Sequence, residues 1–458
     1  MTSDGVAELR SKVRGEVLLA GDDGYDDQRS GWNLTIEHRP AVIVVAESAD
    51  DVAHAVRYAA AEGLPVGVQS TGHGVSVPAE GALLINTRKL TELSVDPVAR
   101  TAKLGAGLRW ADVLPATAEH GLAPLCGSSD QVGVMGYLTG GGLPVTGRTF
   151  GFSASHVREL ELITADGVQR TLSPTSNPDL FWAVRGGKSN FGVVVSATID
   201  LVPQARLYGG AFRYPGDKCE AVLRTYAEWA REQPEEMTSS IILLRFPEMD
   251  RVPDHLRGRF LLNVRIVFTG SEEEGRRLVE PFRALEPEND SVEERPYTRI
   301  AEIYEEPHRA TPAHIRTALL DDVDDETVDA LLEIAGPGVE LPFGGLELRQ
   351  LGGALARPAD RPSAVGSRGE GYHLFLSNPA WPEDAEIRHQ AQQKILDGLS
   401  RWDSGKLLPG FMFNYAATPE DVRRAYDAED FARLSALKAE HDPGNLFRIN
   451  HNIPPQHG

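Results

Sequence analysis

The segment that begins at Ala41 constrains the fold of this chain more than any other. Residues 41–46 form an apolar run that predicts a buried strand, and apolar residues then recur at helical spacing from Val52 to Ala60. Ser48 is the expected N-cap of this helix, and Gly63 is its expected end. A second apolar run returns as a strand, so the segment predicts a strand–helix–strand unit.

A loop of small residues, Ser70-Thr71-Gly72-His73-Gly74, directly follows the second strand. Glycine supplies the positive φ angles that a tight loop needs, and small side chains let the backbone approach a ligand closely. Successive backbone N–H groups in such a loop form a concavity that binds anions such as a pyrophosphate. The loop would therefore hold His73 against the group that the anion carries, although a plain turn is the alternative.

Composition excludes several partners. The 458 residues carry a net charge of −21, which argues against binding to nucleic acid or to an anionic membrane surface. The two cysteines, Cys126 and Cys219, have neither the spacing of metal ligands nor that of a disulfide framework, so we predict no metal site. Neither a signal-peptide pattern nor an apolar run of membrane-spanning length is apparent, and we expect a cytoplasmic location.

The rest of the chain divides near Pro203. Before it lie a second glycine cluster, from Gly133 to Gly142, and a predicted β-hairpin over residues 160–172 that turns at Asp166-Gly167. After it, strands such as residues 260–268 alternate with helices, one of them expected over residues 272–285. This alternation predicts an α+β domain in which helices cover one face of a sheet and the other face is free to cover a ligand.

Several separated segments carry a resemblance. They are Arg39-Pro40 with the 70–74 loop, residues 132–142 (VGVMGYLTGGG), residues 177–187 (NPDLFWAVRGG) with Asn190–Val193, and the tail residues Asp442–Phe447 with Asn450 and Asn452. In this order they resemble the FAD-linked oxidases of the berberine bridge enzyme-like group, within the vanillyl-alcohol-oxidase fold. The match extends over nearly the whole chain.

The resemblance implies an α+β protein with a two-part FAD-binding domain of the PCMH type and an inserted substrate domain made of an antiparallel sheet and helices. We expect the FAD-binding domain at residues 1–204, the substrate domain at 205–415, and a tail at 416–458 that returns to the FAD-binding domain. The residues expected at the FAD are Gln69, Ser70, Thr71, Gly72, His73, Gly74, Ser129, Val132, Gly133, Gly136, Tyr137, Gly140, Gly141, Asn190, Gly192, Val193, Asn414, Asn450 and Asn452.

The resemblance also implies that His73 carries the flavin through a covalent bond to its 8α methyl group. A neutral imidazole nitrogen is a competent nucleophile for this bond, and the alternative is a histidine that only forms a hydrogen bond. Many members of the family have a second link through a cysteine at the position of Ser129, so we expect a single link here. Lys188-Ser189 is a further departure, since the family usually has glycines there, and Gln69 stands where arginine is frequent.

Three side chains are candidates for catalysis. Tyr415 is the tyrosine that remains of the family's Tyr-x-Asn-Tyr segment, because Met412 replaces the first one. Glu347 shares one strand face with Arg349 and is either a base or substrate ligand or one half of a surface ion pair. Tyr137 either faces the flavin or packs beneath the glycine cluster. His156, His314 and His373 lack partner spacing and are expected to be structural.

We therefore expect an FAD-dependent oxidoreductase. It would transfer a hydride from an alcohol or C–H carbon of a medium-sized organic molecule, such as a secondary metabolite or a sugar, to flavin N5, with reoxidation by O₂. A flavin-dependent oxygenase, a dehydrogenase that does not use oxygen, and a non-catalytic flavin-binding protein are the alternatives. A homodimer stays open.

Overall fold

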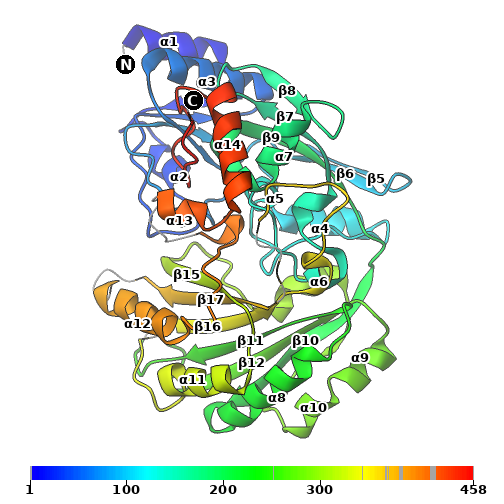
Figure 1. Cartoon of the computed structure of the whole chain (residues 1–458). Helices are drawn as coiled ribbons and strands as arrows, with labels where there is room; N and C mark the ends of the chain where they lie inside the picture. The colour runs from blue at the N-terminus through cyan, green and yellow to red at the C-terminus, as the bar shows by residue number, and fades with distance from the viewer. Residues whose placement is uncertain are drawn as a thin grey trace.

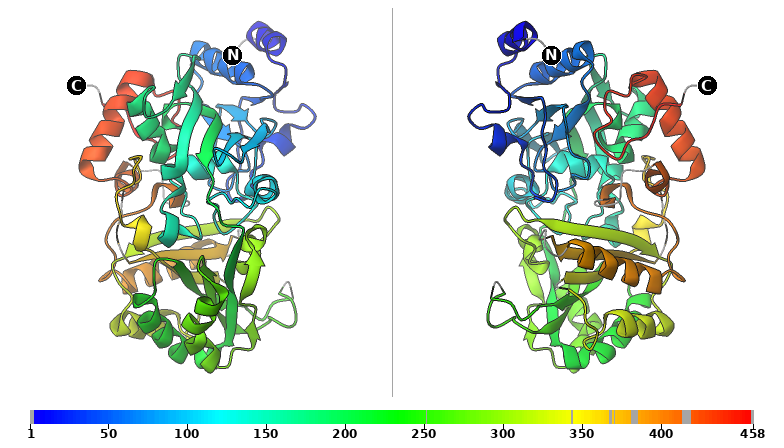
Figure 2. Two further views of the ribbon diagram at one scale, coloured as in Figure 1. Left: turned by 90° about the vertical axis from the view of Figure 1, so that its right-hand side faces the viewer. Right: turned by 90° about the vertical axis from the view of Figure 1, so that its left-hand side faces the viewer.

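The computed structural model describes residues 3–250, 252–342, 344–366, 369, 371–380, 385–412 and 419–456, and it forms two lobes (Figures 1 and 2). The first lobe contains the N-terminal part of the chain together with the C-terminal tail. The second lobe contains the segment between them. No helix among the described residues combines the length and the apolarity that crossing a membrane requires.

Two sheets and their helices build the first lobe. The strands of one sheet, in spatial order, are β1 (Glu16–Leu18), β2 (Val42–Val45), β4 (Leu83–Asn86) and β3 (Val66–Gln69). Those of the other are β5 (Leu93–Asp96), β6 (Thr101–Gly105), β9 (Val193–Asp200), β7 (Val157–Ile163) and β8 (Gln169–Leu172). The helices are α1 (Ser3–Lys12), α2 (Tyr25–Arg29), α3 (Ala49–Glu62), α4 (Trp110–Ala118), α5 (Val134–Thr139), α6 (Gly147–Phe150), α7 (Pro178–Gly187), α13 (Pro419–Arg423) and α14 (Ala428–His441).

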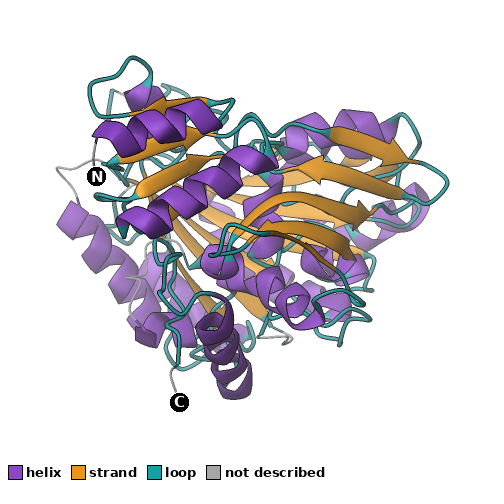
Figure 3. Cartoon of the chain, turned by 90° about the horizontal axis from the view of Figure 1, so that it is seen from above, coloured by secondary structure: helices purple, strands orange, loops and turns teal. Residues whose placement is uncertain are grey.

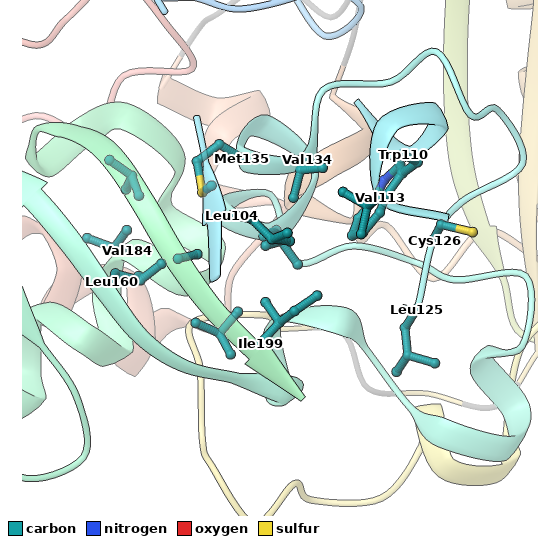
Figure 4. Packing of buried hydrophobic residues seen from close by; sticks show 14 of the residues in the cluster. Leu104, Trp110, Val113, Leu125, Cys126, Val134, Met135, Leu160, Val184 and Ile199 are labelled. Atoms are coloured by element: carbon teal, nitrogen blue, oxygen red, sulfur yellow. The ribbon is translucent and has the colours of Figure 1, made fainter. Parts of the chain in front are cut away.

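Helix α3 packs between the two sheets of this lobe, where helices lie over the strands (Figure 3). Its apolar stripe, which includes Val52 and Val56, shares a core with Val44 of one sheet and Val193 of the other. A second core lies between β6, β7 and β9 and the helices α4, α5 and α7; Leu104, Trp110, Val134 and Ile199 are among its members (Figure 4). The predicted strand–helix–strand unit and the 160–172 hairpin are both present.

An eight-stranded sheet forms the second lobe. Its strands, in spatial order, are β13 (Asn289–Asp290), β10 (Arg206–Pro215), β12 (Phe260–Phe268), β11 (Met237–Arg245), β16 (Gly344–Gln350), β17 (Tyr372–Pro379) and β15 (Ala313–Leu320), with β14 (Glu293–Pro296) also paired to β10. All of these pairings are antiparallel. The helices are α8 (Cys219–Arg231), α9 (Glu272–Leu278), α10 (Glu280–Ala284), α11 (Asp325–Ala335) and α12 (Ala385–Gly398).

Strand alternation sorts the side chains of this sheet onto two faces. Ile241 and Leu243 of β11 and Leu348 of β16 pack with helix α8 in the core of the lobe. The residues that alternate with them along these two strands face the first lobe. The α+β fold with a sheet covered by helices on one face is therefore confirmed (Figure 1). The single helix expected over residues 272–285 is wrong: it is divided into α9 and α10, with Pro281 in the first turn of α10.

The tail returns to the first lobe after the second lobe is complete. Helix α14 packs against α7, so both ends of the described chain lie in that lobe (Figure 1). Lys438 of α14 is fully buried, and its ammonium donates hydrogen bonds to Asp442 and to the carbonyl of Asn190. The tail is thus fastened to the loop that precedes β9.

Candidate functional site

A cavity of about 1040 Å³ lies between the two lobes and brings together residues far apart in the sequence. We call its first-lobe wall the cradle; it comprises Trp32, His38, β3, residues 70–76 with the 70–74 loop, α5, the Lys188–Gly192 segment and the tail around Asn450. We call its second-lobe wall the sheet wall; it is the uncovered face of the eight-stranded sheet. This volume is at the upper end for a ligand pocket and suits one large ligand or two smaller ones.

The 70–74 loop is shaped by its contact with residues 31–33. The Trp32 amide donates to the Thr71 carbonyl over 2.8 Å, and the Asn33 amide donates to the Gly72 carbonyl over 3.3 Å. Gly72 has a φ of 75°, and a Cβ atom there would lie 2.5 Å from Gly31 Cα. Only glycine fits this position, which explains one of the small residues that mark the loop in the sequence.

His73 is held in a fixed orientation on the cradle. Its ring stacks on Trp32, with centroids 4.5 Å apart and planes 17° from parallel, and its Nδ1 lies 2.8 Å from Thr71 Oγ1. Burial lowers the pKa of His73 to about 3, so the imidazole is neutral at physiological pH. Its Nε2 is buried and has no hydrogen-bond partner among the described residues. A neutral imidazole with one unpartnered nitrogen therefore lies on the cavity wall.

Other polar atoms of the cradle share this property. Buried polar groups are normally hydrogen-bonded, and each exception needs an explanation, such as a bound ligand. Within the described part of the chain, eight buried cradle atoms have no partner, and all belong to residues on the cavity wall: Trp32 Nε1, His38 Nε2, Gln69 Oε1, Ser70 Oγ, His73 Nε2, Ser76 Oγ, Asn450 Oδ1 and His451 Nε2. A large polar ligand would satisfy them.

The structure places most of the predicted site residues on this wall. They are Gln69, Ser70, Thr71, Gly72, His73, Gly74, Ser129, Val132, Gly133, Gly136, Tyr137, Gly192, Glu347 and Asn450. Asn414 and Tyr415 lie outside the described residues. Contact between any of these residues and a flavin stays a prediction.

Five predicted residues lie away from the wall: Gly140, Gly141, Asn190, Val193 and Asn452. Gly140 packs against the backbone of Gly410, and Gly141 packs against the side chain of Val365, so each glycine leaves room for a close neighbour. The Asn190 side chain donates to the carbonyls of Gly187 and His451 and accepts from the Ile453 amide, which ties the loop to the tail. Val193 is part of the core around α3.

Tyr137 both lines the cavity and packs against the cradle. A Cβ on either Gly127 or Gly142 would meet its ring, and Trp110 contacts it edge-on with centroids 5.4 Å apart. Its hydroxyl accepts a hydrogen bond of 3.5 Å from Ser153. Burial raises the pKa of Tyr137 well above 10, so its hydroxyl is a neutral phenol and a poor proton acceptor at physiological pH.

Glu347 lies on the sheet wall and is 1% exposed, so the alternative of a surface ion pair is wrong. Its carboxylate accepts hydrogen bonds from Ser240 Oγ (2.7 Å), Arg265 (2.8 Å) and Arg349 Nε (2.9 Å). Burial raises the pKa of Glu347, but the two guanidinium groups lower it by more, so that the net pKa is about 2. The carboxylate is therefore ionised and fully partnered, which makes it a weak general base.

Sequence reasoning missed many residues of the wall, and three of them are Arg265, Trp32 and Lys188. Arg265 alternates with Asn263 in the otherwise apolar strand β12, and this polar period of two was a usable signal. Trp32 gave no such signal, because only the fold brings it to His73.

Lys188 is the third, and it was noted only as a departure from the family pattern. Its ammonium donates to His451 Nδ1 over 3.3 Å, and burial lowers the pKa of Lys188 to about 8. Its backbone has φ 55° and ψ −144°, a conformation that costs a residue other than glycine about 1–3 kcal/mol. A glycine at this position would be unstrained.

Comparison with known proteins identifies two family models in the chain. A model of the FAD binding domain matches residues 40–173, and a model described as berberine and berberine like matches residues 413–454. The (R)-6-hydroxynicotine oxidase of Paenarthrobacter nicotinovorans is 28% identical over 464 residues, and the match covers 97% of each chain. An uncharacterized FAD-linked oxidoreductase of Bacillus subtilis is 26% identical, and the match covers 97% of this chain and 98% of that protein.

Solved structures share the fold over nearly the whole length. The 6-hydroxy-D-nicotine oxidase from Arthrobacter nicotinovorans has a TM-score of 0.84 and 23% identity, covering 97% of this chain and 98% of its own. The carbohydrate oxidase from Microdochium nivale has a TM-score of 0.85 and 17% identity, and the match covers 99% of this chain and 100% of that protein.

Proposed function

Because the chain belongs to the FAD-linked oxidases of the berberine bridge enzyme-like group, we propose that the cradle binds FAD and that a small organic substrate lies between the flavin and the sheet wall. The protein is an FAD-linked oxidoreductase. The observation that carries the placement is the set of eight unpartnered polar atoms on the cradle.

His73 is the residue that would carry the flavin, through a bond from its imidazole to the 8α methyl group. Thr71 occupies its Nδ1, which leaves Nε2 as the nitrogen available for the bond. A second link is not expected. Ser129 lies on the wall at the position where many relatives have a cysteine, and the nearby Cys126 is buried in the core, where burial raises the pKa of its thiol to about 12.

Bound FAD would supply the redox chemistry, as the acceptor of a hydride from the substrate and the donor of two electrons to O₂. The protein residues position the reactants and exclude water. Ionised Glu347, held by Arg265 and Arg349, offers a substrate fixed charges rather than a proton acceptor. We propose an alcohol or C–H donor of medium size as substrate, a secondary metabolite or a sugar, because relatives are named for 6-hydroxynicotine and for carbohydrates.

The covalent link is tested by acid precipitation of the purified protein. Yellow colour should stay with the denatured pellet of the wild type and be lost from the pellet of His73→Ala. The control His120→Ala removes an exposed histidine beyond the end of α4 and should leave the pellet yellow. Release of the flavin into the wild-type supernatant would disprove the covalent link while retaining the FAD site, and a colourless protein that FAD cannot reconstitute would disprove both.

Substrate oxidation is tested by adding candidate alcohols, amines and sugars without oxygen and following the bleaching of the flavin. On admission of air, an oxidase recovers its colour rapidly and releases one H₂O₂ per substrate. A dehydrogenase stays bleached until another electron acceptor is added, and an oxygenase places an oxygen atom in the product. Failure of a broad panel to bleach the flavin would support a non-catalytic flavin-binding role.

A further inference from the structure

The sheet wall changes from polar to apolar along the direction of its strands. Strand pairing places Arg265, Ser240 and Arg349 in one row across β12, β11 and β16, and it places Glu347 in the next row. The row after that is mostly apolar, and we call it the Gly345 row; it contains Leu261, Leu244, Gly345, Ser377 and Ile315. All of these residues except Ser240 line the cavity. A ligand that lies along the strands therefore meets charges at one end and hydrocarbon at the other.

The polar end carries more positive than negative charge. Glu347 binds both Arg265 and Arg349, which we call the arginine pair, so one buried carboxylate matches two buried guanidinium groups. A second carboxylate, that of Glu306, lies 3.8 Å from Arg349 Nη2, beyond hydrogen-bond distance, and its side chain is 35% exposed. Water therefore competes with Arg349 for Glu306. Because a buried charge is costly unless an opposite charge meets it, the second guanidinium indicates an anionic ligand.

The arginine pair also retains unused hydrogen-bond donors. Within the described residues, Arg265 Nε is buried without a partner, and Arg349 Nη1 has none either. Tyr304 and His373 lie beside the pair but supply no charge, because burial raises the pKa of the phenol and lowers that of the imidazole to about 3. Guanidinium donors on a cavity wall match the planar oxygens of a carboxylate.

The apolar end is flat at its centre. A Cβ atom on Gly345 would lie 3.1 Å from Ile242 Cδ1 and 3.4 Å from Leu244 Cδ2, so these two side chains lie close against the glycine. Phe246 and Leu256, in the segment that connects β11 to β12, continue the apolar lining of the cavity. A flat hydrocarbon surface of this kind favours a ring system over a sugar, whose hydroxyl groups would lose water there without gaining partners.

We propose that the sheet wall binds an amphipathic carboxylic acid, with its carboxylate on the arginine pair and its apolar body against the Gly345 row. The inference rests on the proposed function and narrows its substrate class to organic acids with a hydrocarbon ring system, in preference to neutral sugars. Arg349 then determines specificity for charge, and Gly345 determines specificity for shape.

Three probes of nearly the same shape test the charge: 2-naphthoate is an anion, 2-naphthamide is neutral, and protonated 2-naphthamidine is a cation. In titration calorimetry of the flavin-loaded protein, 2-naphthoate should bind about tenfold or more tightly than 2-naphthamide, because hydrogen bonds to charged groups are the stronger ones. 2-Naphthamidine should bind most weakly. Arg349→Met should remove the preference for the anion while leaving Glu347 paired with Arg265, and Arg349→Lys should retain most of it. Arg401→Met removes an exposed partner of Glu326 and should change nothing.

Two further variants separate these roles from damage to the fold. Glu347→Gln removes the carboxylate that competes for the arginine pair, so 2-naphthoate should bind more tightly, whereas a disrupted wall would weaken all three probes. Gly345→Val should weaken 2-naphthoate and 2-naphthamide alike and affect benzoate less, since benzoate lacks the second ring. Gly338→Val adds the same side chain at an exposed glycine with open space around it and should have no effect.

Equal binding of the three naphthyl probes, or tightest binding of 2-naphthamidine, would overturn the inference. Unchanged 2-naphthoate affinity in Arg349→Met would overturn it too, since another cation such as Lys188 would then hold the carboxylate. Failure of the proposed function is distinct: wild-type protein would then hold no flavin, which its visible spectrum reports independently of the titrations.

Discussion

The ion pair that fastens the tail allows a quantitative prediction. Lys438 is 0% exposed, and its ammonium donates to Asp442 Oδ2 (2.6 Å), the Asn190 carbonyl (2.6 Å) and the Phe447 carbonyl (3.1 Å). Lys438→Met removes the charge but keeps most of the side-chain volume. We expect this change to destabilise the folded protein and to loosen the loop that contains Lys188.

The magnitude follows from the three hydrogen bonds. A hydrogen bond to a charged group contributes about 1.5–3 kcal/mol, so the gross loss is about 4.5–9 kcal/mol. Two terms reduce it: the desolvation of the buried ammonium is no longer incurred, and Asp442 keeps the amides of Leu446 and Phe447 as donors. The net loss should therefore be about 3–5 kcal/mol, as measured for other buried ion pairs that lose one partner.

Equilibrium unfolding in urea, followed by flavin fluorescence and by circular dichroism, measures this loss. Lys406→Met removes an exposed partner of Asp427 and should cost less than about 1 kcal/mol. The double variant Lys438→Met/Asp442→Asn should lose less than the sum of the two single variants, because each single change breaks the same pair. A loss below about 1 kcal/mol in Lys438→Met would refute the argument that this buried pair fastens the tail.

Two further predictions concern stability. Burial, with a smaller contribution from Arg349, lowers the pKa of His373 to about 3, so the folded protein favours the neutral imidazole. The free energy of unfolding is therefore unaffected by this group above about pH 6.5, and it decreases as the pH falls toward 3. His373→Phe should therefore reduce the loss of unfolding free energy on acidification, by about 2 kcal/mol at pH 5, so that the unfolding temperature declines less steeply with falling pH. An unchanged decline would contradict the assignment. Arg148 of α6 donates to the carbonyls of Gln233, Met237 and Leu351 and so joins the lobes. Arg148→Met should cost about 3 kcal/mol in urea unfolding, and exposed Arg109→Met less than about 1 kcal/mol; equal losses would show that the lobes do not depend on Arg148.

Local signals predicted the elements whose ends are set by neighbouring residues. Ser48 Oγ accepts a hydrogen bond from the Asp51 amide at the start of α3, and Gly63 ends that helix with a φ of 67°. Strand β12 has the predicted bounds, Phe260–Phe268. Helix α5 was missed inside the glycine cluster, because its six residues are stabilised by the core around Trp110 rather than by their own sequence. Strand β15 was missed because it is defined by its pairing with β17.

Glu347 shows why the chemistry of the site was harder to predict than its location. The period of two along β16 placed Glu347 and Arg349 on one face, but it could not decide the state of the carboxylate. That state depends on register: Ser240 of β11 pairs with Arg265 on one side and with Arg349 on the other, so both guanidinium groups reach the same carboxylate. With one arginine the group would be an ordinary ion pair, whereas with two its pKa falls to about 2. Since Glu347 is ionised and fully partnered, a base must be sought elsewhere on the wall. The sequence of β16 could not show this, because the second charge belongs to Arg265 of β12.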